Sequence, residues 1–390
     1  MIGERLMQLR LAQNLTLDAL AVKMGGMVTK QALSKYERNQ IQPSPIVLAK
    51  LSVALGVKAN YFLVPSNISI EFIAYRKLTS LPDREKARVK SVVAQSLEDR
   101  IKVQTLIGQG KSDFLPWNQL SISSLEDTET HANEIRKLWE LGVSPISNVV
   151  STLEEHQLCV LSIEADEKFD GISALARDVS GKTIAGALVT RHGVTGERQR
   201  LNLTHELGHA VLKIPSTIDE EQAAFRFASA FLVPAERLVK EVGFRRSYVH
   251  ISELLILKKQ FGISLQALLR RMRDLDIIND SYYRRWCIYI GKQGWKKQEP
   301  DELPQEIPQW LKRNLSRLVG EGAISREEAE RMLGATMEVQ QRTNIEQRRA
   351  FLRLPIEQRR KEISEQVKLL SGYYEKEAEL LTTEEEISDY

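Results

Sequence analysis

The chain has 390 residues, of which 42% are hydrophobic and 27% charged, and its formal net charge is +3. This composition is typical of a globular protein, and the length suggests two to four domains of roughly 100–200 residues each. No apolar run approaches the roughly 18–20 residues that a membrane helix requires, so we expect no membrane partner. The charged N-terminal residues are unlike a secretory signal, and we expect a cytoplasmic protein.

Cysteine usage and local charge narrow the function classes further. Cys159 and Cys287 lie in apolar segments without a CxxC partner, which excludes a disulfide framework and a thiolate zinc cluster, and we expect both to be buried thiols. Residues 1–66 hold eight Lys/Arg against three Asp/Glu, whereas acidic side chains crowd the last seven residues. The basic excess favours a nucleic-acid partner for the N-terminal segment.

In chain order, the predicted elements fall into five segments, and the fold class is mainly α with a small α+β part. Short helices with apolar periodicity cover residues 1–66, and a charged helical connector covers 67–115, with a helix that begins near Pro82. Mixed helices and strands follow over 116–245, with β-like apolar runs at 158–165 and 183–190. Residues 246–335 are predicted to form a helical bundle, and 336–390 a charged helical tail.

The segment RLNLTHELGHAVL, residues 200–212, carries the HExxH spacing. Because residues four apart lie on one face of a helix, His205 and His209 can bind the same ion while Glu206 stands beside it. The leucines fall on the opposite side and can be buried. The spacing predicts a Zn²⁺ site where the metal activates water and Glu206 takes the proton, which is the chemistry of peptide hydrolysis. A coincidental pair of helical histidines is the alternative.

A catalytic zinc site with one open position needs a third protein ligand. Thr217 and Glu220 have capping-box spacing, which assigns Glu220 to the start of the next helix and leaves Glu221 as the candidate ligand. Later residues of that helix are apolar, and a carboxylate beside a core favours a metal or a cation. The alternative for Glu221 is a solvated acid that the helix dipole favours.

The zinc helix and the following EEQAAFRFASAFLVPAE together resemble the ImmA/IrrE family of metallopeptidases, which pairs HExxH with a downstream E-x-x-A-N-x-F-A segment. The resemblance covers roughly residues 130–235 and implies a zincin-like domain with a small sheet. It also implies that His205, His209 and Glu221 are the zinc ligands and Glu206 the general base. The chain departs from the family pattern at Phe225, where relatives usually carry Asn, and at Val233.

Residues 16–38 have helix-turn-helix spacing, with a glycine turn at Gly25 and Gly26 and a second helix beginning near Thr29. The segment resembles the Xre family of lambda-repressor-like domains, which implies five helices and binding to double-stranded DNA. Asn39 stands where that pattern has Gly, and Asn can adopt the same left-handed geometry.

If the second helix enters the major groove, its N-terminal side chains contact bases and phosphates. These DNA-binding candidates are Thr29, Lys30, Gln31, Ser34 and Lys35. Leu17 stands where relatives often carry Gln, which removes a polar contact to the DNA backbone. A protein-interaction module without DNA binding is the alternative.

Residues 247–272 form two further predicted helices around Gly262, and in the ImmA/IrrE family this position often holds a second helix-turn-helix-like bundle. Arg270, Arg271 and Arg273 could contact DNA there, but a solvated basic face is slightly preferred. Arg198 and Arg200 could orient substrate or the helix, but for them too a solvated face is preferred. Trp286, Trp295 and Trp310 lie among basic residues, and such interleaved aromatic and basic residues suit nucleic acid or, more commonly, anchor a small core. The tail core, FLRLPIEQRRKEISEQ, is weakly similar to bacterial antitoxins, and a charged amphipathic helix is the alternative.

These segments together predict a DNA-binding regulator with zinc-dependent endopeptidase activity. By the resemblance, the cleaved protein is a repressor or an antitoxin, in stress response, mobile-element control or a toxin-antitoxin system. The alternative is a non-catalytic transcriptional regulator or antitoxin whose zinc site is structural. A toxin partner and a homodimer are further expectations.

Overall fold

A computed structural model describes residues 2–63, 68–73, 81–109, 117, 119–337, 351–361, 363–364 and 367. The chain divides into two units, Met1–Ala335 and Thr336–Tyr390. In the second unit, residues 351–353 and 356–361 are helical. The rest of the predicted antitoxin-like tail lies almost entirely outside the described residues. No helix in the described residues combines the length and apolarity needed to span a membrane.

The first 63 residues form five short helices around a small core. They are α1 (Ile2–Ala12), α2 (Leu17–Lys23), α3 (Lys30–Glu37), α4 (Pro45–Leu55) and α5 (Asn60–Leu63). The side-chain oxygens of Thr16, Thr29 and Ser44 accept hydrogen bonds from backbone N–H groups at the starts of α2, α3 and α4. Leucines from all the longer helices meet in the core, so the predicted five-helix arrangement is confirmed.

Left-handed backbone geometry sets the turns between these helices. Gly25 and Gly26 follow α2 with φ of 73° and 70°, and Asn39 follows α3 with φ of 54°. Side chains with a Cβ are strained in this region, and Asn tolerates it better than most residues. The glycine turn and the role predicted for Asn39 are both confirmed.

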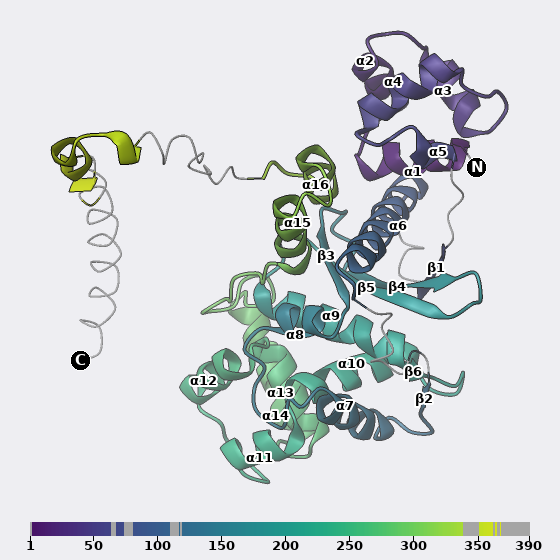
Figure 1. Ribbon diagram of the computed structural model, residues 1–390. Coiled ribbons are helices and arrows are strands. Elements are labelled where there is room, and N and C mark those ends of the chain that lie inside the picture. Colours follow the sequence, from purple (N-terminus) through teal and green to yellow (C-terminus); the bar gives the residue numbers. More distant parts are fainter. Residues whose placement is uncertain are drawn as a thin grey trace. The chain divides into compact units, whose positions relative to one another are not determined.

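A four-stranded sheet, in the order β1-β4-β5-β3, forms the centre of the next part (Figure 1). Its strands are β1 (Ile68–Ile73), β3 (Cys159–Ile163), β4 (Gly171–Asp178) and β5 (Thr183–Arg191). β4 is antiparallel to both of its neighbours, and β3 is parallel to β5. A second, parallel pair joins β2 (Leu120–Ser121) to β6 (Leu212–Lys213). Both predicted apolar runs are strands.

Residues 67–115 differ from the helical connector expected from the sequence. Ile68–Ile73 is strand β1, which pairs with β4 from Ile68 opposite Asp178 to Ile73 opposite Ser173. The following helix, α6 (Asp83–Leu106), packs its buried side chains against the sheet. The alternation of ISIEFI explains the strand, because every second side chain contacts the apolar core.

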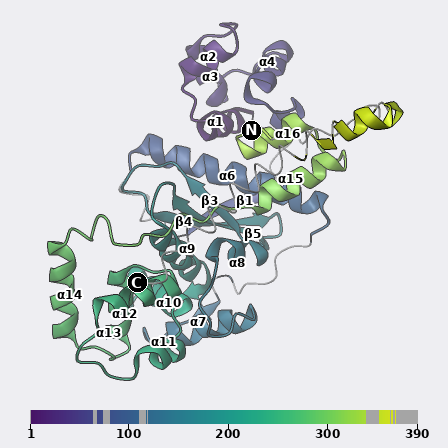
Figure 2. The ribbon, with the colours of Figure 1, turned by 90° about the vertical axis from the view of Figure 1, so that its left-hand side faces the viewer.

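The two faces of the sheet pack against different helices. The even-numbered side chains of β4, including Ile172 and Ala174, join α6 in one apolar core. Helix α9 (Gly196–Val211) packs on the opposite face, which the odd-numbered β4 residues Gly171 and Ser173 share (Figures 1 and 2). The sheet thus supports α9 from one side and is itself covered by α6 on the other.

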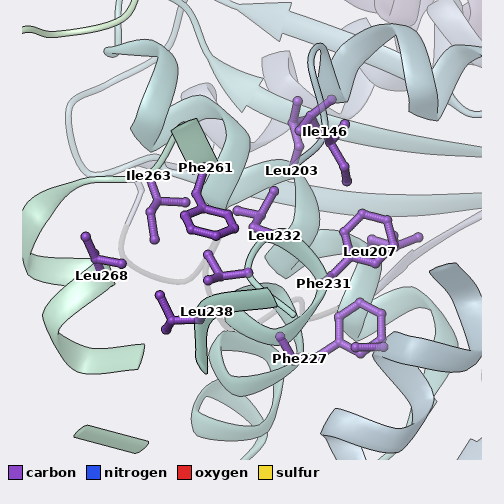
Figure 3. Close-up of a cluster of buried hydrophobic side chains, with 14 of the residues drawn as sticks. Ile146, Leu203, Leu207, Phe227, Phe231, Leu232, Leu238, Phe261, Ile263 and Leu268 are labelled. Carbon is purple, nitrogen blue, oxygen red and sulfur yellow. The ribbon is translucent and has the colours of Figure 1, made fainter. Parts of the chain in front are cut away.

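Helices below the sheet form the largest core. They are α7 (Asp127–Leu138), α8 (Val149–Glu155), α9, α10 (Glu220–Leu232), α11 (Ala235–Val242), α12 (Ile251–Phe261), α13 (Leu265–Asp274) and α14 (Asp280–Lys292). Figure 3 shows Leu203 and Leu207 of α9 beside Phe227 and Phe231 of α10 in this core. Because α9 buries its leucines here, its histidines lie on another side. The predicted mainly-α fold with a small sheet is confirmed.

Two more helices, α15 (Trp310–Gly320) and α16 (Arg326–Leu333), return the chain to α6. Arg331 of α16 forms a bidentate ion pair with Asp99 of α6 at 2.9 and 3.2 Å. The guanidinium of Arg100 stacks on the Trp310 ring, 3.2 Å from its centroid. Trp310 therefore anchors a core, which is the role favoured from the sequence.

Three of the side-chain assignments from the sequence are wrong. Arg271 is fully buried, where it pairs with Glu129 and donates to the Val233 carbonyl, so it neither contacts DNA nor covers a solvated face. Arg200 is 5% exposed and pairs with Glu306 at 3.2 Å. Cys287 is only half-buried, unlike Cys159. Amphipathic periodicity cannot reveal the two buried arginines, because their partners, Glu129 and Glu306, lie 142 and 106 residues away in sequence.

Candidate metal centre

Helix α9 presents the HExxH side chains to a confined space between β4 and α10. His205, Glu206 and His209 are exposed by only 2%, 1% and 4%. Leu203 and Leu207 fill the core on the other side of the helix. The 3.6-residue period therefore separates the apolar and metal-ligating faces of α9, as the sequence pattern predicts.

Three potential ligands converge at this place. The Nε2 atoms of His205 and His209 lie 3.0 Å apart, and Glu221 of α10 places one carboxylate oxygen 3.4 Å from His205 Nε2 and the other 3.3 Å from His209 Nε2. All three ligand atoms fall within 4.8 Å of one another. The structure thus brings together the two histidines and the acid that were predicted as ligands.

The donor set and its spacing fit zinc. Zinc binds imidazole nitrogen and carboxylate oxygen at about 2.0–2.2 Å, and the corners of a tetrahedron of that size lie about 3.3 Å apart. The three separations at the cluster, 3.0, 3.3 and 3.4 Å, match that edge. Three protein ligands leave one corner for water or substrate, which is the arrangement of catalytic sites.

The start of α10 determines where Glu221 lies. Asp219 is the N-cap, and its side chain accepts a hydrogen bond from Gln222 N at 2.7 Å. The predicted capping box with Thr217 is therefore wrong, because Asp219 takes that role and α10 begins at Glu220. Both glutamates of the first turn are then available to the histidines of α9.

Glu220 has a role that the sequence analysis missed. Its Oε1 lies 3.2 Å from His209 Nδ1, the ring nitrogen that does not face the cluster. A carboxylate at the second nitrogen of a ligating imidazole fixes its tautomer and orientation. The signal available in the sequence was the pair of adjacent acids, and the capping pattern wrongly explained one of them.

Glu206 contacts strand β4 beside the cluster. Ser173 donates a hydrogen bond to Glu206 Oε2 at 3.3 Å, and both side chains are buried. At Gly171, an added Cβ would lie 3.2 Å from Glu206 Oε1 and 2.8 Å from the Val189 carbonyl oxygen. A glycine and a small hydroxyl residue on β4 therefore leave room for the Glu206 carboxylate and orient it.

Two cavities lie near the cluster. One, of about 550 Å³, is lined by His209 and Glu220, by Glu71 and Arg177 of β1 and β4, and by the loop before α10. The other, of about 630 Å³, is lined by Phe225 and by residues of α13 and α14. The Phe225 ring is 46% exposed and lies 4.0 Å from the His205 ring. The first cavity thus reaches the cluster at His209, whereas the second is bounded by Phe225, whose ring contacts that of His205.

The DNA-binding candidates lie on and before helix α3. Thr29, Lys30, Gln31 and Lys35 are exposed and Ser34 is half-buried. Thr29 also caps the helix, and Lys30 pairs with Asp18 at 3.3 Å in a solvent-exposed contact. Such pairs contribute little and can exchange for a phosphate contact. The N-terminal part of α3 is therefore accessible to DNA.

Comparisons with known families assign two parts of the chain. Residues 6–62 match the family model described as Helix-turn-helix, which covers most of the five N-terminal helices. Residues 188–273 match the family model described as IrrE N-terminal-like domain, of a peptidase family, from the end of β5 into α13. No curated protein and no solved structure matches the chain. The chain thus joins an Xre-like helix-turn-helix domain to an ImmA/IrrE-like peptidase-family domain.

Proposed function

We propose that this chain is a DNA-binding regulator with zinc-dependent endopeptidase activity, and that its substrate is a protein such as a repressor or an antitoxin. The convergence of His205, His209 and Glu221 beside Glu206 is the observation that supports the peptidase. The exposed N-terminal side of α3 supports the DNA-binding role.

Each residue of the site has a distinct role in this proposal. His205, His209 and Glu221 hold Zn²⁺, which supplies Lewis-acid activation of a water molecule and of the scissile carbonyl. The Glu206 carboxylate takes the proton of the attacking water and passes it to the leaving amine nitrogen. Glu220 lies 3.2 Å from His209 Nδ1, close enough to orient the ring when the metal binds, and Ser173 holds the Glu206 carboxylate.

The surroundings of the cluster favour an extended peptide as substrate. A peptide that crosses the cluster can place side chains in both cavities, whose linings include residues of β1, β4, α9, α10, α13 and α14. The first cavity is polar at Glu71 and Arg177, and the second carries the exposed Phe225 ring. These walls can contact side chains on both sides of a scissile bond.

The decisive experiment compares metal content with cleavage. The purified chain should hold one zinc by elemental analysis, and His205→Ala or His209→Ala should lose it, because two ligands cannot complete the site. Glu206→Gln should keep the zinc and abolish cleavage of a co-expressed, genomically adjacent regulator or toxin partner, because it removes the base and no ligand. Mass spectrometry of partner fragments gives the readout.

Glu155→Gln, on α8, is the matched control, and it should keep both zinc and cleavage. Intact partner in the presence of the zinc-loaded wild type, together with normal regulation by Glu206→Gln, would contradict the peptidase. That result would leave the alternative, a regulator in which zinc stabilises the fold.

A further inference from the structure

Residues 284–297, which cover most of α14 and the turn after it, carry five cations and no acidic residue. The cations are Arg284, Arg285, Lys292, Lys296 and Lys297. All five are exposed. This concentration of one sign of charge is unusual in a chain whose formal net charge is only +3 over 390 residues.

Cationic side chains around this segment pair with carboxylates, whereas, among the described residues, these five do not. Arg226 and Arg273 pair with Asp274, and Lys258 pairs with Glu299 at 3.2 Å. By contrast, no carboxylate of a described residue lies within 4.0 Å of any of the five. Their charges are therefore available to an external anion.

Helical spacing gathers the cations on one side of α14. Arg285 and Lys292 lie seven residues apart, close to two full turns, which places them on the same face about 10 Å apart along the helix, and Arg284 lies beside that face. Gly294, with φ of 75°, then reverses the chain. An added Cβ at Gly291 would lie 3.9 Å from Lys296 Cε, so the Lys296 side chain returns to the last turn of α14.

Aromatic rings fix this turn against the helix. Tyr289 makes edge contacts with Trp286 at 5.4 Å and with Trp295 at 5.5 Å between ring centroids. Both tryptophans also pack against the large core. Trp295 thus holds the backbone that carries Lys296 and Lys297, so the basic surface is presented by an ordered support. Tyr289 itself is 41% exposed among the cations.

We propose that this basic face of α14 is a second DNA-contacting surface, which binds the phosphate backbone of duplex DNA independently of α3. Charge complementarity supports a polyanion, and the helix-turn-helix domain of the same chain supports DNA as the occupant. The arginines of the preceding helix do not perform this function, because Arg271 is buried against Glu129 and both Arg270 and Arg273 pair with Asp274. Contacts of this kind add affinity without reading sequence.

The test uses the full chain and a labelled duplex of about 40 base pairs with arbitrary sequence, and it measures the dissociation constant by fluorescence anisotropy between about 50 and 200 mM salt. The test variant is Lys292→Gln/Lys296→Gln/Lys297→Gln. The matched control is Lys259→Gln/Arg317→Gln/Arg326→Gln, in which the exposed Lys259 and Arg317 and the half-buried Arg326 each have an acidic partner. Both variants remove three charges, so net charge alone cannot distinguish them.

The test variant should bind at least about tenfold more weakly at 50 mM salt, and its slope of log affinity against log salt should be smaller by about 2–3, because each lost phosphate contact removes about 0.9. The control should match the wild type in slope and keep at least about half of its affinity. Unchanged thermal unfolding shows that both variants are folded.

Two results would overturn the proposal. One is equal loss in the test and control variants, which would show a general charge effect. The other is unchanged DNA binding by the test variant together with lost binding to vesicles containing phosphatidylserine, which would assign the face to a membrane surface. Lys30→Ala/Lys35→Ala, measured in parallel, reports on the contribution of α3 separately.

Discussion

At the scale of single residues, the candidate base depends on a strand that precedes it by 33 positions. Ser173 is completely buried and its hydroxyl donates to Glu206. A carboxylate held by a fixed donor spends more of its time in the geometry that proton transfer requires. Ser173 is therefore a positioning residue, whose loss should affect the rate more than substrate binding.

Ser173→Ala should retain one zinc and lower the cleavage rate constant about tenfold with little change in KM, because loss of orientation costs on the order of 10–100-fold in rate. Steady-state kinetics on the identified partner, with elemental analysis, measures both effects. Ser162→Ala, on β3 of the same sheet, is the control, since its hydroxyl contacts His192 and not Glu206. Equal rates for the two variants would contradict the role of Ser173.

The sequence predicts part of this site and not the rest, for physical reasons. His205 and His209 are four apart on one helix, so their convergence follows from helix geometry alone. Glu221 is close enough in sequence to be found by the need for a third ligand. Ser173 and Glu220 were missed, because strand register and the exact start of α10 depend on tertiary packing.

At the scale of elements, α6 covers one face of the sheet and completes the core on that side. Its Val89, Val93 and Leu97 are fully buried against the apolar side of the sheet. Burial of each such side chain contributes about 1.5–3 kcal/mol. A fragment that begins at residue 116 therefore lacks both α6 and the edge strand β1, and it exposes the core side of β4 and β5.

Leu97→Ala in the full chain should lower the free energy of unfolding by about 2–5 kcal/mol, the usual cost of truncating a buried leucine. Chemical denaturation followed by circular dichroism measures this. Leu106→Ala is the matched control on the same helix, because Leu106 is 44% exposed and should change stability by less than about 0.5 kcal/mol. Similar losses in both variants would show that the α6 core does not stabilise the sheet.

Strand β1, at the edge of the sheet, shows why the sequence predicts only some of the helices and strands. ISIEFI alternates as a strand should, but six residues next to a strongly charged segment give a weak signal. Its partner, β4, begins 98 residues after the end of β1, at Gly171. Local periodicity identifies the longer helices well, whereas pairing across such a separation cannot be read from one sequence.

At the scale of the first unit, the helix-turn-helix domain packs against α6. Helix α1 packs along α6, and the Tyr61 hydroxyl lies 2.9 Å from Gln95 Oε1 and 2.9 Å from Glu98 Oε2. Arg5 lies over the Tyr61 ring at 4.4 Å. Burial, with the nearby Glu98 carboxylate, raises the pKa of Tyr61 above its ordinary value of 10, so the hydroxyl keeps its proton at neutral pH.

Tyr61→Phe should weaken this docking by about 1–3 kcal/mol, because it keeps the ring and removes the hydrogen-bond donor from a buried carboxylate contact. Differential scanning calorimetry should then resolve an earlier transition for the helix-turn-helix domain. Tyr248→Phe, at a tyrosine that is 62% exposed, should leave the thermogram unchanged. A single wild-type-like transition in Tyr61→Phe would show that the hydroxyl does not secure the domain.

The position of β1 constrains how such a chain can exchange its DNA-binding module during evolution. The strand starts only five residues after the last helix of that module, yet it forms one edge of the four-stranded sheet and lines the cavity beside His209. A recombination junction downstream of Ile73 would carry away a sheet edge along with the module. Viable exchange is therefore confined to residues 64–67. A new DNA-binding module joined there would be linked directly to β1, which forms part of the wall of the cavity beside His209.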